Sequence, residues 1–477
     1  MRRRAGPNRV PPPAAYELRR FFLLIGVVAT LVATAMLPAR LGGPSDVSAA
    51  APRLVVLVTI DALRADHLGI YGYSRPTSPN IDAFARESIV IQDAIAQAPY
   101  TKASIASLMT GLYPSAHKTY TTAYAVADAM HGHVSGTPPS TDVLPAAVTT
   151  LAEAFKAAGY ATAAITTNPF LIADFGFSQG FDTFEFVGGE GFAAADRVLG
   201  RALDVINQQR RPLLLWVHLM EPHSPYTPSQ ALRRELPPLG PPVLVPSSVT
   251  IPPWIAVDGS RDVRLYESLY DAEIRTADAA FGTFVAALRE RDDWHATALV
   301  LTADHGEQFM EHGGFEHNTT LYDELLRVPL IIRVPGLHQR FVESQVELVD
   351  VMPTLVGLAG GEVRGTIQGR DLRPMLNGQP MVADPAFAEI VGQQSMVRTR
   401  EWKLIEAAGG GGELFALARD PREQHPVDHP VRAAELSRVL DALMASAQRA
   451  GATIAGETAP ISPGTKRRLE ALGYLNR

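Results

Sequence analysis

Residues 54–82 read LVVLVTIDALRADHLGIYGYSRPTSPNID, and this stretch decides the fold. It opens with an unbroken apolar and β-branched run from Leu54 to Ile60, which ends abruptly at Asp61. Continuous runs of this kind are typical of strands that are buried on both faces of a parallel sheet. The polar and turn-forming residues that follow indicate a loop. We therefore predict that Asp61 stands at the carboxyl end of a central parallel strand.

The same design recurs in other apolar runs. They are 161–165, followed by Asn168; 213–217, followed by His218 and His223; and 298–302, followed by Asp304 and His305. With helical patterns such as 148–158 and 271–289 between them, these runs predict an α/β fold, a mostly parallel central sheet flanked by helices. Ligands of open α/β sheets gather at the carboxyl ends of the strands, so we expect the polar residues to meet at one edge.

The pattern changes near residue 386, where the short strand-like pieces AFAEI, SMVRTR, WKLIEA and ELFAL are broken by the glycine run 409–412. We read these pieces as a small antiparallel α+β subdomain, followed by helical segments at 431–449 and 465–472. Two stretches rich in turn-forming residues, 121–145 and 228–253, are predicted to be irregular surface insertions.

The amino-terminal segment combines arginines with the apolar run FFLLIGVVATLVATAML, residues 21–37. Basic residues on one side and a Pro/Gly/Ser linker on the other predict an export signal or a membrane anchor rather than a buried core helix. Either outcome places the catalytic part outside the cytoplasm, in the periplasm or at the cell surface. The predicted divisions are a basic segment 1–20, an anchor or signal 21–38, a linker 39–50, a catalytic domain 51–380 and a C-terminal subdomain with a helical tail 381–477.

Composition narrows the classes of function. A chain of 477 residues with 46% hydrophobic content can bury a large core. The formal charge of −7 and the lack of a long basic stripe do not favour nucleic acid as a partner. The sequence holds no cysteine, which excludes disulfides, a thiolate nucleophile and Cys-ligated zinc.

Candidate metal ligands stand at two of the strand ends. An aspartate after a strand is commonly structural, so Asp61 alone would be weak evidence. The adjacent Asp304 and His305 in TADHGE add a carboxylate and an imidazole, which offer hard and borderline ligands to one divalent ion. Two acidic strand ends on one sheet edge favour a metal site.

Thr101 precedes the helical segment KASIASLMTG. Its structural role would be an N-cap, and the free amides of the same helix terminus would also attract an anionic substrate. A hydroxyl is a poor nucleophile near neutral pH unless a base or a metal lowers its pKa, and a metal held by Asp61, Asp304, His305 and Thr101 itself would do so.

His223 in HLMEPHSPY and His317 are further candidates. A single histidine is more often structural, but together these two could bind a second metal ion, or hold substrate oxygens and assist the leaving group. His218 and His312 are predicted to support the site from outside. Lys102, His117 and Lys118 are expected to be solvated.

Several blocks resemble, in the same order, those of the sulfatase family in the alkaline phosphatase superfamily. After the opening stretch come ASLMTGLYPSAH, LAEAFKAAGYATAAI, WVHLMEPHSPY, LTADHGEQFMEHG, LYDELLRVPLIIRVPG, VDVMPTLVGLAGG and IQGRDLRPML. The resemblance implies the α/β fold of that family and a metal-dependent hydrolase of sulfate or phosphate esters.

The departures from the sulfatase pattern concern the nucleophile. Sulfatases carry a cysteine or serine, followed by xPSR, that is converted to formylglycine. Here Thr101 stands at that position and Ile105 replaces the arginine, while Asn168 and Phe170 replace a Lys and a His that hold the sulfate. Threonine instead resembles the nucleotide phosphodiesterases and the phosphoethanolamine and phosphoglycerol transferases of the superfamily.

By that resemblance the motif positions fall on Asp61, Thr101, His218, His223, Asp304, His305 and His317. A histidine at 305, where sulfatases have asparagine, favours one or two Zn or Mn ions, with Ca possible. Hydrolysis of an anionic ester, phosphate mono- or diester rather than sulfate, is the leading hypothesis. The alternatives are transfer of a phosphoryl group to an envelope lipid or glycan, and a non-catalytic binding protein.

Overall fold

The computed structural model describes residues 51–123, 125–127, 140–189, 191–382 and 384–471. The predicted anchor or signal at 21–38 lies outside these residues. In the described part of the chain, no helix combines the length and the apolar character needed to cross a membrane.

The central sheet has nine strands, in the order β11-β2-β10-β7-β1-β6-β4-β5, with β12 beside β2. Its middle consists of the four predicted strands, which are β1 (Leu54–Ile60), β4 (Ala161–Thr166), β6 (Leu213–Leu219) and β7 (Thr297–Ala303). They run parallel to one another, and every residue of each is buried. The other strands are β2 (Ile89–Ile95), β5 (Thr183–Phe186), β10 (Arg327–Arg333), β11 (Arg340–Val342) and β12 (Val346–Glu347), of which β10 is antiparallel to both neighbours. The predicted mostly parallel sheet is confirmed.

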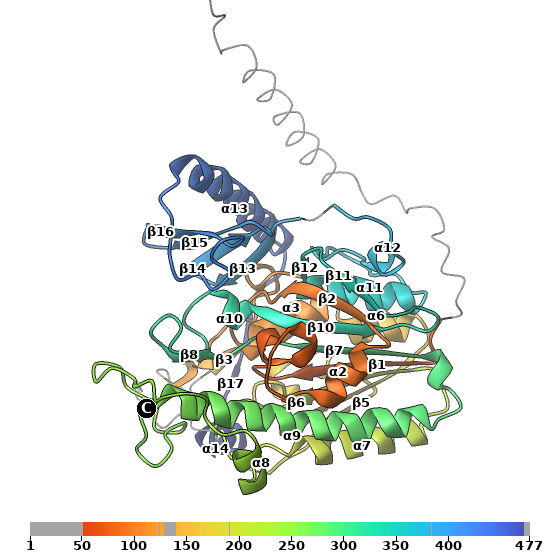
Figure 1. Ribbon diagram of the computed structural model, residues 1–477. Helices are drawn as coiled ribbons and strands as arrows, with labels where there is room; N and C mark the ends of the chain where they lie inside the picture. Colours follow the sequence, from red (N-terminus) through yellow and green to blue (C-terminus); the bar gives the residue numbers. More distant parts are fainter. Residues whose placement is uncertain (1–50, 124, 128–139, 190, 383, 472–477) are drawn as a thin grey trace, which may run out of the picture. The chain divides into compact units, whose positions relative to one another are not determined.

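Helices cover both faces of this sheet (Figure 1). One layer contains α2 (Pro79–Ala85), α7 (Ala195–Gln208), α8 (Gln230–Glu235) and α9 (Val263–Arg289); the other contains α3 (Thr101–Thr110), α6 (Leu151–Ala157), α11 (Val351–Leu358) and α12 (Arg373–Leu376). The predicted helix at 271–289 begins earlier, at Val263, where Asp262 caps the first turn. The predicted helix at 148–158 begins at Leu151, because Thr150 and Glu153 form a capping box.

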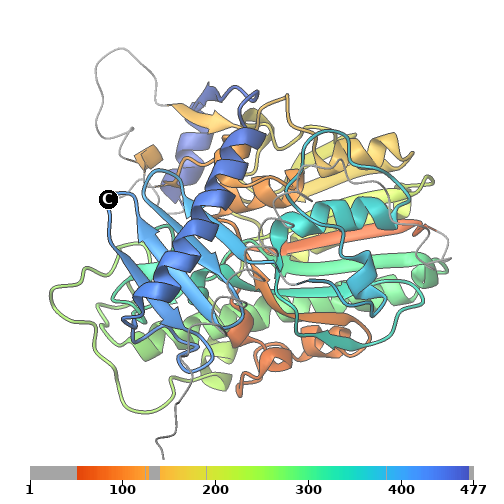
Figure 2. The same cartoon turned by 90° about the horizontal axis from the view of Figure 1, so that it is seen from above.

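The smaller sheet is antiparallel, as the short strand-like pieces predicted. Its strands are β13 (Ala386–Ile390), β14 (Gln394–Arg398), β15 (Trp402–Ala407) and β16 (Gly412–Ala416). The long helix α13 (Pro430–Ala450) lies across them (Figure 2). Phe387, Leu404 and Leu440 belong to the separate hydrophobic cluster between helix and sheet.

The tail after α13 returns to the main body. Strand β17 (Glu457–Pro460) pairs antiparallel with β3 (Ser140–Val143), and α14 (Pro463–Ala471) follows. The insertion 121–145, predicted to be irregular, therefore ends in a strand. The insertion 228–253 contains only the short α8 and is otherwise irregular and largely exposed, as predicted.

Candidate active site

The strand ends of the central sheet gather the predicted polar residues. Strands β1 and β7 are neighbours in register, with Ile60 opposite Ala303, so the residues that follow them, Asp61 and Asp304, lie at the same edge. Both aspartates are fully buried. The expectation that the strand-end residues meet at one edge is confirmed for Asp61 and Asp304.

Asp61, Asp304 and His305 form a compact group of potential ligands. His305 Nε2 lies 3.6 Å from Asp61 Oδ1 and 3.5 Å from Asp304 Oδ2. Neither of these carboxylate oxygens has a hydrogen-bond partner. His305 Nδ1 donates to the Gly306 carbonyl at 2.8 Å, which leaves the Nε2 lone pair directed to the carboxylates.

This group fits a divalent cation. One ligand atom from each residue can be chosen so that all lie within 4.8 Å of one another. Buried carboxylate oxygens without partners are costly, and a metal ion is a common means of compensating them. Burial, and next the Asp61 carboxylate, raise the pKa of Asp304 to about 7. The pKa of Asp61 is lowered: burial opposes this, but His223 and His218 outweigh it.

The second oxygen of Asp61 is held by neighbouring strands. Asn168, which follows β4, donates from Nδ2 to Asp61 Oδ2 at 2.6 Å. His218 on β6 lies with Nε2 3.2 Å from the same oxygen, and its Nδ1 is 2.8 Å from the Thr59 hydroxyl. With Nε2 donating to the carboxylate, Nδ1 accepts from Thr59. Both residues therefore orient Asp61, and His218 lies in the supporting place that was predicted for it.

Thr101 begins helix α3 beside this group. Its Oγ1 lies 3.3 Å from His305 Nε2 and 3.5 Å from Asp61 Oδ2. The N-cap residue is Tyr100, so Thr101 is the first helical residue rather than the predicted cap. The helix terminus places its free backbone amides next to the hydroxyl, where they favour negative charge.

His223 and His317 also lie at this edge. The ring centroids of the two histidines are 5.1 Å apart, and those of His305 and His317 are 4.4 Å apart. His223 Nδ1 donates to the Ser224 carbonyl at 2.6 Å. The residues predicted as metal ligands, as nucleophile and as substrate-binding histidines are thus brought together, whereas His312 is not among them.

Glu307 is a residue that sequence reasoning did not assign. Its Oε1 lies 3.0 Å from His317 Nδ1, and its Oε2 accepts from the Tyr226 hydroxyl at 3.1 Å. The carboxylate is buried, and burial raises its pKa to about 7. The backbone on either side of His317 is left-handed, with φ of 66° at Glu316 and 82° at Asn318, conformations that non-glycine residues adopt mainly at constrained sites. The only sequence signal for Glu307 was its place in the DHGE string.

One lysine and two histidines lie in other surroundings than the sequence predicted. Lys102 and His117 are 2% and 0% exposed, so the prediction that they are solvated is wrong. Lys102 pairs with Asp142, and His117 Nε2 lies 3.0 Å from the Ser107 hydroxyl, because both side chains point between packed elements. His312 contacts Glu324 and the Glu423 carbonyl and stacks on Tyr322, outside the group around Asp61.

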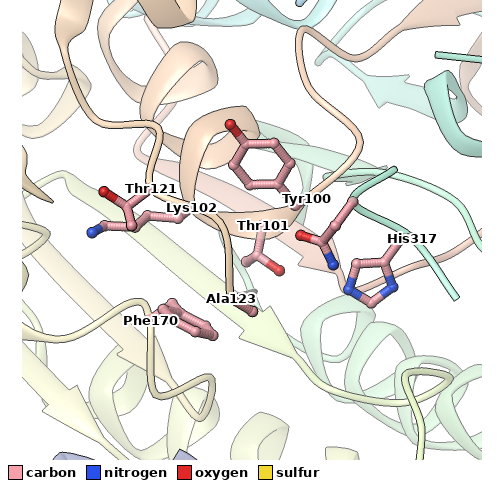
Figure 3. Close-up of a pocket in the computed structure, with 8 residues that line it drawn as sticks. Tyr100, Thr101, Lys102, Thr121, Ala123, Phe170 and His317 are labelled. Atoms are coloured by element: carbon pink, nitrogen blue, oxygen red, sulfur yellow. The ribbon is translucent and has the colours of Figure 1, made fainter. Parts of the chain in front are cut away.

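A pocket opens beside Thr101. Its lining consists of Tyr100, Thr101, Lys102, Thr121, Ala123, Phe170, His317 and Asn318 (Figure 3). In this view Phe170 and His317 lie on either side of Thr101. Asn318 is 5% exposed, and its Oδ1 has no hydrogen-bond partner.

The sulfatase family model matches residues 53–361. The chain belongs to the sulfatase family. A second model, N-sulphoglucosamine sulphohydrolase, C-terminal, matches residues 310–450 of this sulfatase-family protein. The resemblance stated from the motifs is thereby confirmed.

Curated relatives of this sulfatase-family protein include arylsulfatase K of Danio rerio, 33% identical over 176 residues. That match covers 34% of this chain and 34% of the relative, so it spans about a third of the relative's length. An uncharacterized sulfatase, YidJ, of Escherichia coli (strain K12) is 25% identical over 453 residues, covering 82% of this chain and 86% of the relative.

Solved structures share the fold of this sulfatase-family protein. The phosphonate monoester hydrolase of Agrobacterium radiobacter superimposes with a TM-score of 0.68 at 20% identity, covering 83% of this chain and 96% of that one. A protein solved in complex with its substrate D-glucosamine-2-N,6-O-disulfate gives a TM-score of 0.70 at 19% identity, covering 85% and 99%. At such identities the likeness shows the α/β fold alone.

Proposed function

We propose that this sulfatase-family chain hydrolyses phosphate or sulfate esters, with phosphate esters preferred and Thr101 as the nucleophile. The observation that carries the proposal is the position of the Thr101 hydroxyl, 3.3 Å from His305 Nε2 and 3.5 Å from Asp61 Oδ2, at a helix terminus. A nucleophile beside ligand atoms for a cation, with backbone amides to receive an anion, is the set of parts that ester displacement needs.

Asp61, Asp304 and His305 would hold the metal ion, with Thr101 as a further ligand. When bound, the ion supplies positive charge that acidifies a hydroxyl and neutralises substrate oxygens. Zn or Mn suits the mixed carboxylate and imidazole set. His223 and His317 would hold substrate oxygens and deliver a proton to the leaving group, or bind a second ion.

The displacement would proceed through the threonine. The Thr101 oxygen loses its proton and attacks phosphorus in line, while the bond to the ester oxygen breaks and that oxygen takes up a proton. Water then attacks the same phosphorus, the bond between phosphorus and the Thr101 oxygen breaks, and a proton from that water returns to the Thr101 oxygen. A monoester substrate thus releases phosphate, and a diester releases a phosphate monoester. Threonine cannot form formylglycine, and the sequence contains no cysteine, so phosphate chemistry is favoured over the sulfatase route.

A transferase is the second candidate, because the predicted anchor or signal at 21–38 would place the site outside the cytoplasm near envelope lipids and glycans. In that case an acceptor alcohol would replace water in the second step. A non-catalytic binding protein is less favoured, since the orphaned oxygens of Asp61 and Asp304 are retained beside a hydroxyl.

A turnover screen tests the proposal. The chain from residue 50 onward, reconstituted with Zn or Mn, would be assayed on aryl phosphate, aryl phosphodiester and aryl sulfate beside a Thr101→Ala variant. We expect phosphoester turnover that is lost in Thr101→Ala. Sulfate-only turnover that survives this substitution would overturn the nucleophile, and product formed only with an added alcohol would identify a transferase.

A further inference from the structure

The pocket beside Thr101 contains very little free charge. Among the described residues that line it, Lys102 and the imidazole of His317 are the side chains able to carry a positive charge, and the others are neutral. An anionic substrate would normally be expected to use such a lysine. His317 lies with Nδ1 3.0 Å from the Glu307 carboxylate, so the contacts of Lys102 decide whether the pocket offers a further cation.

Lys102 is already fully engaged within the protein. Its ammonium group donates to the Thr141 hydroxyl at 2.6 Å and to the carbonyl and the carboxylate Oδ1 of Asp142. An ammonium group has three N–H donors, so these acceptors use all of them. Lys102 and Asp142 are 2% and 8% exposed. A substrate anion could recruit Lys102 only by breaking a buried ion pair, which leaves an uncompensated charge behind.

Asp142 also holds the segment that contains Thr121, which lines the pocket. Its Oδ2 accepts from the backbone amides of Tyr120 and Thr121 at 2.5 and 2.7 Å. Thr121 and Ala123 line the pocket. The Asp142 carboxylate, which neutralises Lys102, therefore also positions this segment. Asp142 lies on β3, opposite Thr458 of β17, and that pairing anchors the strand.

The remaining wall is apolar. Phe170 lines the pocket, and its position is set by the hydrogen bond from its backbone amide to Asn168 Oδ1 at 2.8 Å. The same Asn168 orients Asp61, so the aromatic ring is tied to the candidate metal group. An aromatic face favours contact with an uncharged group over a second anionic oxygen.

We propose that this pocket is a charge-neutral subsite, which accepts the uncharged substituent of a singly charged ester, and that the Lys102–Asp142 pair keeps it neutral. A phosphodiester carries one negative charge, whereas a phosphate monoester carries nearly two near neutral pH. Among the described residues that line the subsite, the second charge of a monoester would find no cation without a carboxylate partner, because Lys102 is paired with Asp142 and His317 with Glu307. This inference rests on the proposed ester hydrolysis and names its preferred substrate class.

Kinetic selectivity tests the subsite. The probes are p-nitrophenyl phosphate and phenyl p-nitrophenyl phosphate, which share a leaving group and differ in charge. For the full-length wild-type protein we expect kcat/KM to favour the diester by at least about tenfold, the scale of one uncompensated charge at close range. Asp142→Asn removes the carboxylate that stabilises the Lys102 ammonium group, whose pKa burial lowers. At the acid limit of the activity, where Lys102 holds its proton, this variant should therefore show a preference lowered about tenfold.

Two control variants separate charge from structure. The double variant Lys102→Met/Asp142→Asn removes both charges and should restore the wild-type preference, even where the absolute rate falls. Asp182→Asn removes the partner of Lys156 in an ion pair whose side chains are 47% and 39% exposed, and should leave the preference unchanged. A wild-type preference for the monoester, or equal shifts in the Asp142→Asn and double variants, would overturn the inference.

Binding provides a readout that does not depend on turnover. Calorimetry with the metal-reconstituted Thr101→Ala variant would compare diphenyl phosphate with phenyl phosphate. We expect diphenyl phosphate to bind at least about tenfold more tightly. If this order holds while the wild-type protein releases no product, only the proposed hydrolysis fails. If the order is reversed while the wild-type protein turns over esters, only the neutral subsite fails.

Discussion

The two carboxylate oxygens of Asp61 have different surroundings. Oδ2 accepts from Asn168 and lies within reach of His218, whereas Oδ1 has no hydrogen-bond partner. A metal-ligating carboxylate is commonly oriented in this way, through one oxygen, so that the other stays available. Asn168 therefore orients Asp61, a role that the sequence alone does not indicate.

Removal of the Asn168 amide should therefore weaken metal binding. We expect Asn168→Ala to lower the affinity for Mn or Zn, and with it activity, by about 10–100-fold, the usual effect of losing a partner of a metal ligand. Metal titration followed by calorimetry measures this. Asn377→Ala, which removes a hydrogen bond to the Arg373 carbonyl instead, is the matched control. Equal affinity in the Asn168→Ala variant and the control would contradict the assignment.

Glu307 should act through His317. A carboxylate beside Nδ1 keeps the proton on that nitrogen and leaves Nε2 for the site. We expect Glu307→Gln to lower kcat by about 10–100-fold with little change in KM. In a His317→Ala background the same substitution should cost almost nothing more, because the two residues form one unit. Independent, multiplying losses would show that Glu307 has a different task.

At the scale of elements, the candidate site depends on how strands end and helices begin. Strands β1 and β7 end next to Asp61 and Asp304, and helix α3 begins at Thr101.

A buried acidic residue outside the candidate site, Glu347, joins the central sheet to the small antiparallel sheet. Glu347 on β12 accepts from the Phe387 amide of β13 and from the Tyr113 hydroxyl. Burial, and next Asp350, raise the pKa of Glu347 to about 8.

This shift predicts how stability depends on pH. Because the pKa of Glu347 is raised on folding from 4.5 to about 8, its stabilising contribution is complete below pH 4.5 and is lost as the pH rises to 8. In Glu347→Gln the amide oxygen can accept from the Phe387 amide, the amide NH2 group can donate to the Tyr113 hydroxyl oxygen in the reverse direction, and the side chain does not ionise. We expect the melting temperature of the variant, relative to wild type, to rise across this window by an amount equivalent to about 4–5 kcal/mol.

Thermal melts at a series of pH values check this expectation. A solvent-exposed carboxylate offers the matched control, and Glu343→Gln, whose side chain is 70% exposed, should show no such trend. A constant difference between Glu347→Gln and wild type from pH 5 to 8 would show that the carboxyl group titrates normally in the folded protein.

At the scale of the whole molecule, the described residues between 51 and 471 belong to one compact unit. The small sheet packs against the main body through Glu347 and the buried ion pair of Lys403 with Asp323. The tail then returns as β17 to pair with β3, on the strand that carries Asp142. The C-terminal part of the chain therefore supports the pocket beside Thr101.

Metal binding should stabilise the entire fold. Asp61 and Asp304 are buried next to each other, and a cation between them relieves their repulsion only in the folded state. We expect Mn or Zn at 100 times the dissociation constant to add about 2.7 kcal/mol to the free energy of unfolding, and a chelator to remove it. Calorimetric melts measure the shift. Asp304→Asn should make the melting temperature almost insensitive to both additives, and a full shift in that variant would place the ion elsewhere.

The central strands, the small antiparallel sheet and the strand-end positions of Asp61, Asp304 and His305 could be predicted from the sequence. Apolar runs report burial, and parallel strands place their carboxyl ends together, so local pattern and one topological rule suffice. Helix starts were less accurate, since α9 begins at Val263 and Tyr100 rather than Thr101 caps α3. Those boundaries depend on caps that a periodic pattern does not contain.

By itself, then, the sequence determined the fold class, the family and the residues that gather around Asp61, because each of these follows from local pattern or ordered motifs. Only the tertiary structure decided the fate of the other polar side chains. Lys102 pairs with Asp142, Glu307 holds His317, and β17 reaches β3. Partners of this kind are distant in the chain, and a buried polar group takes whichever partner the packed elements bring within hydrogen-bond distance.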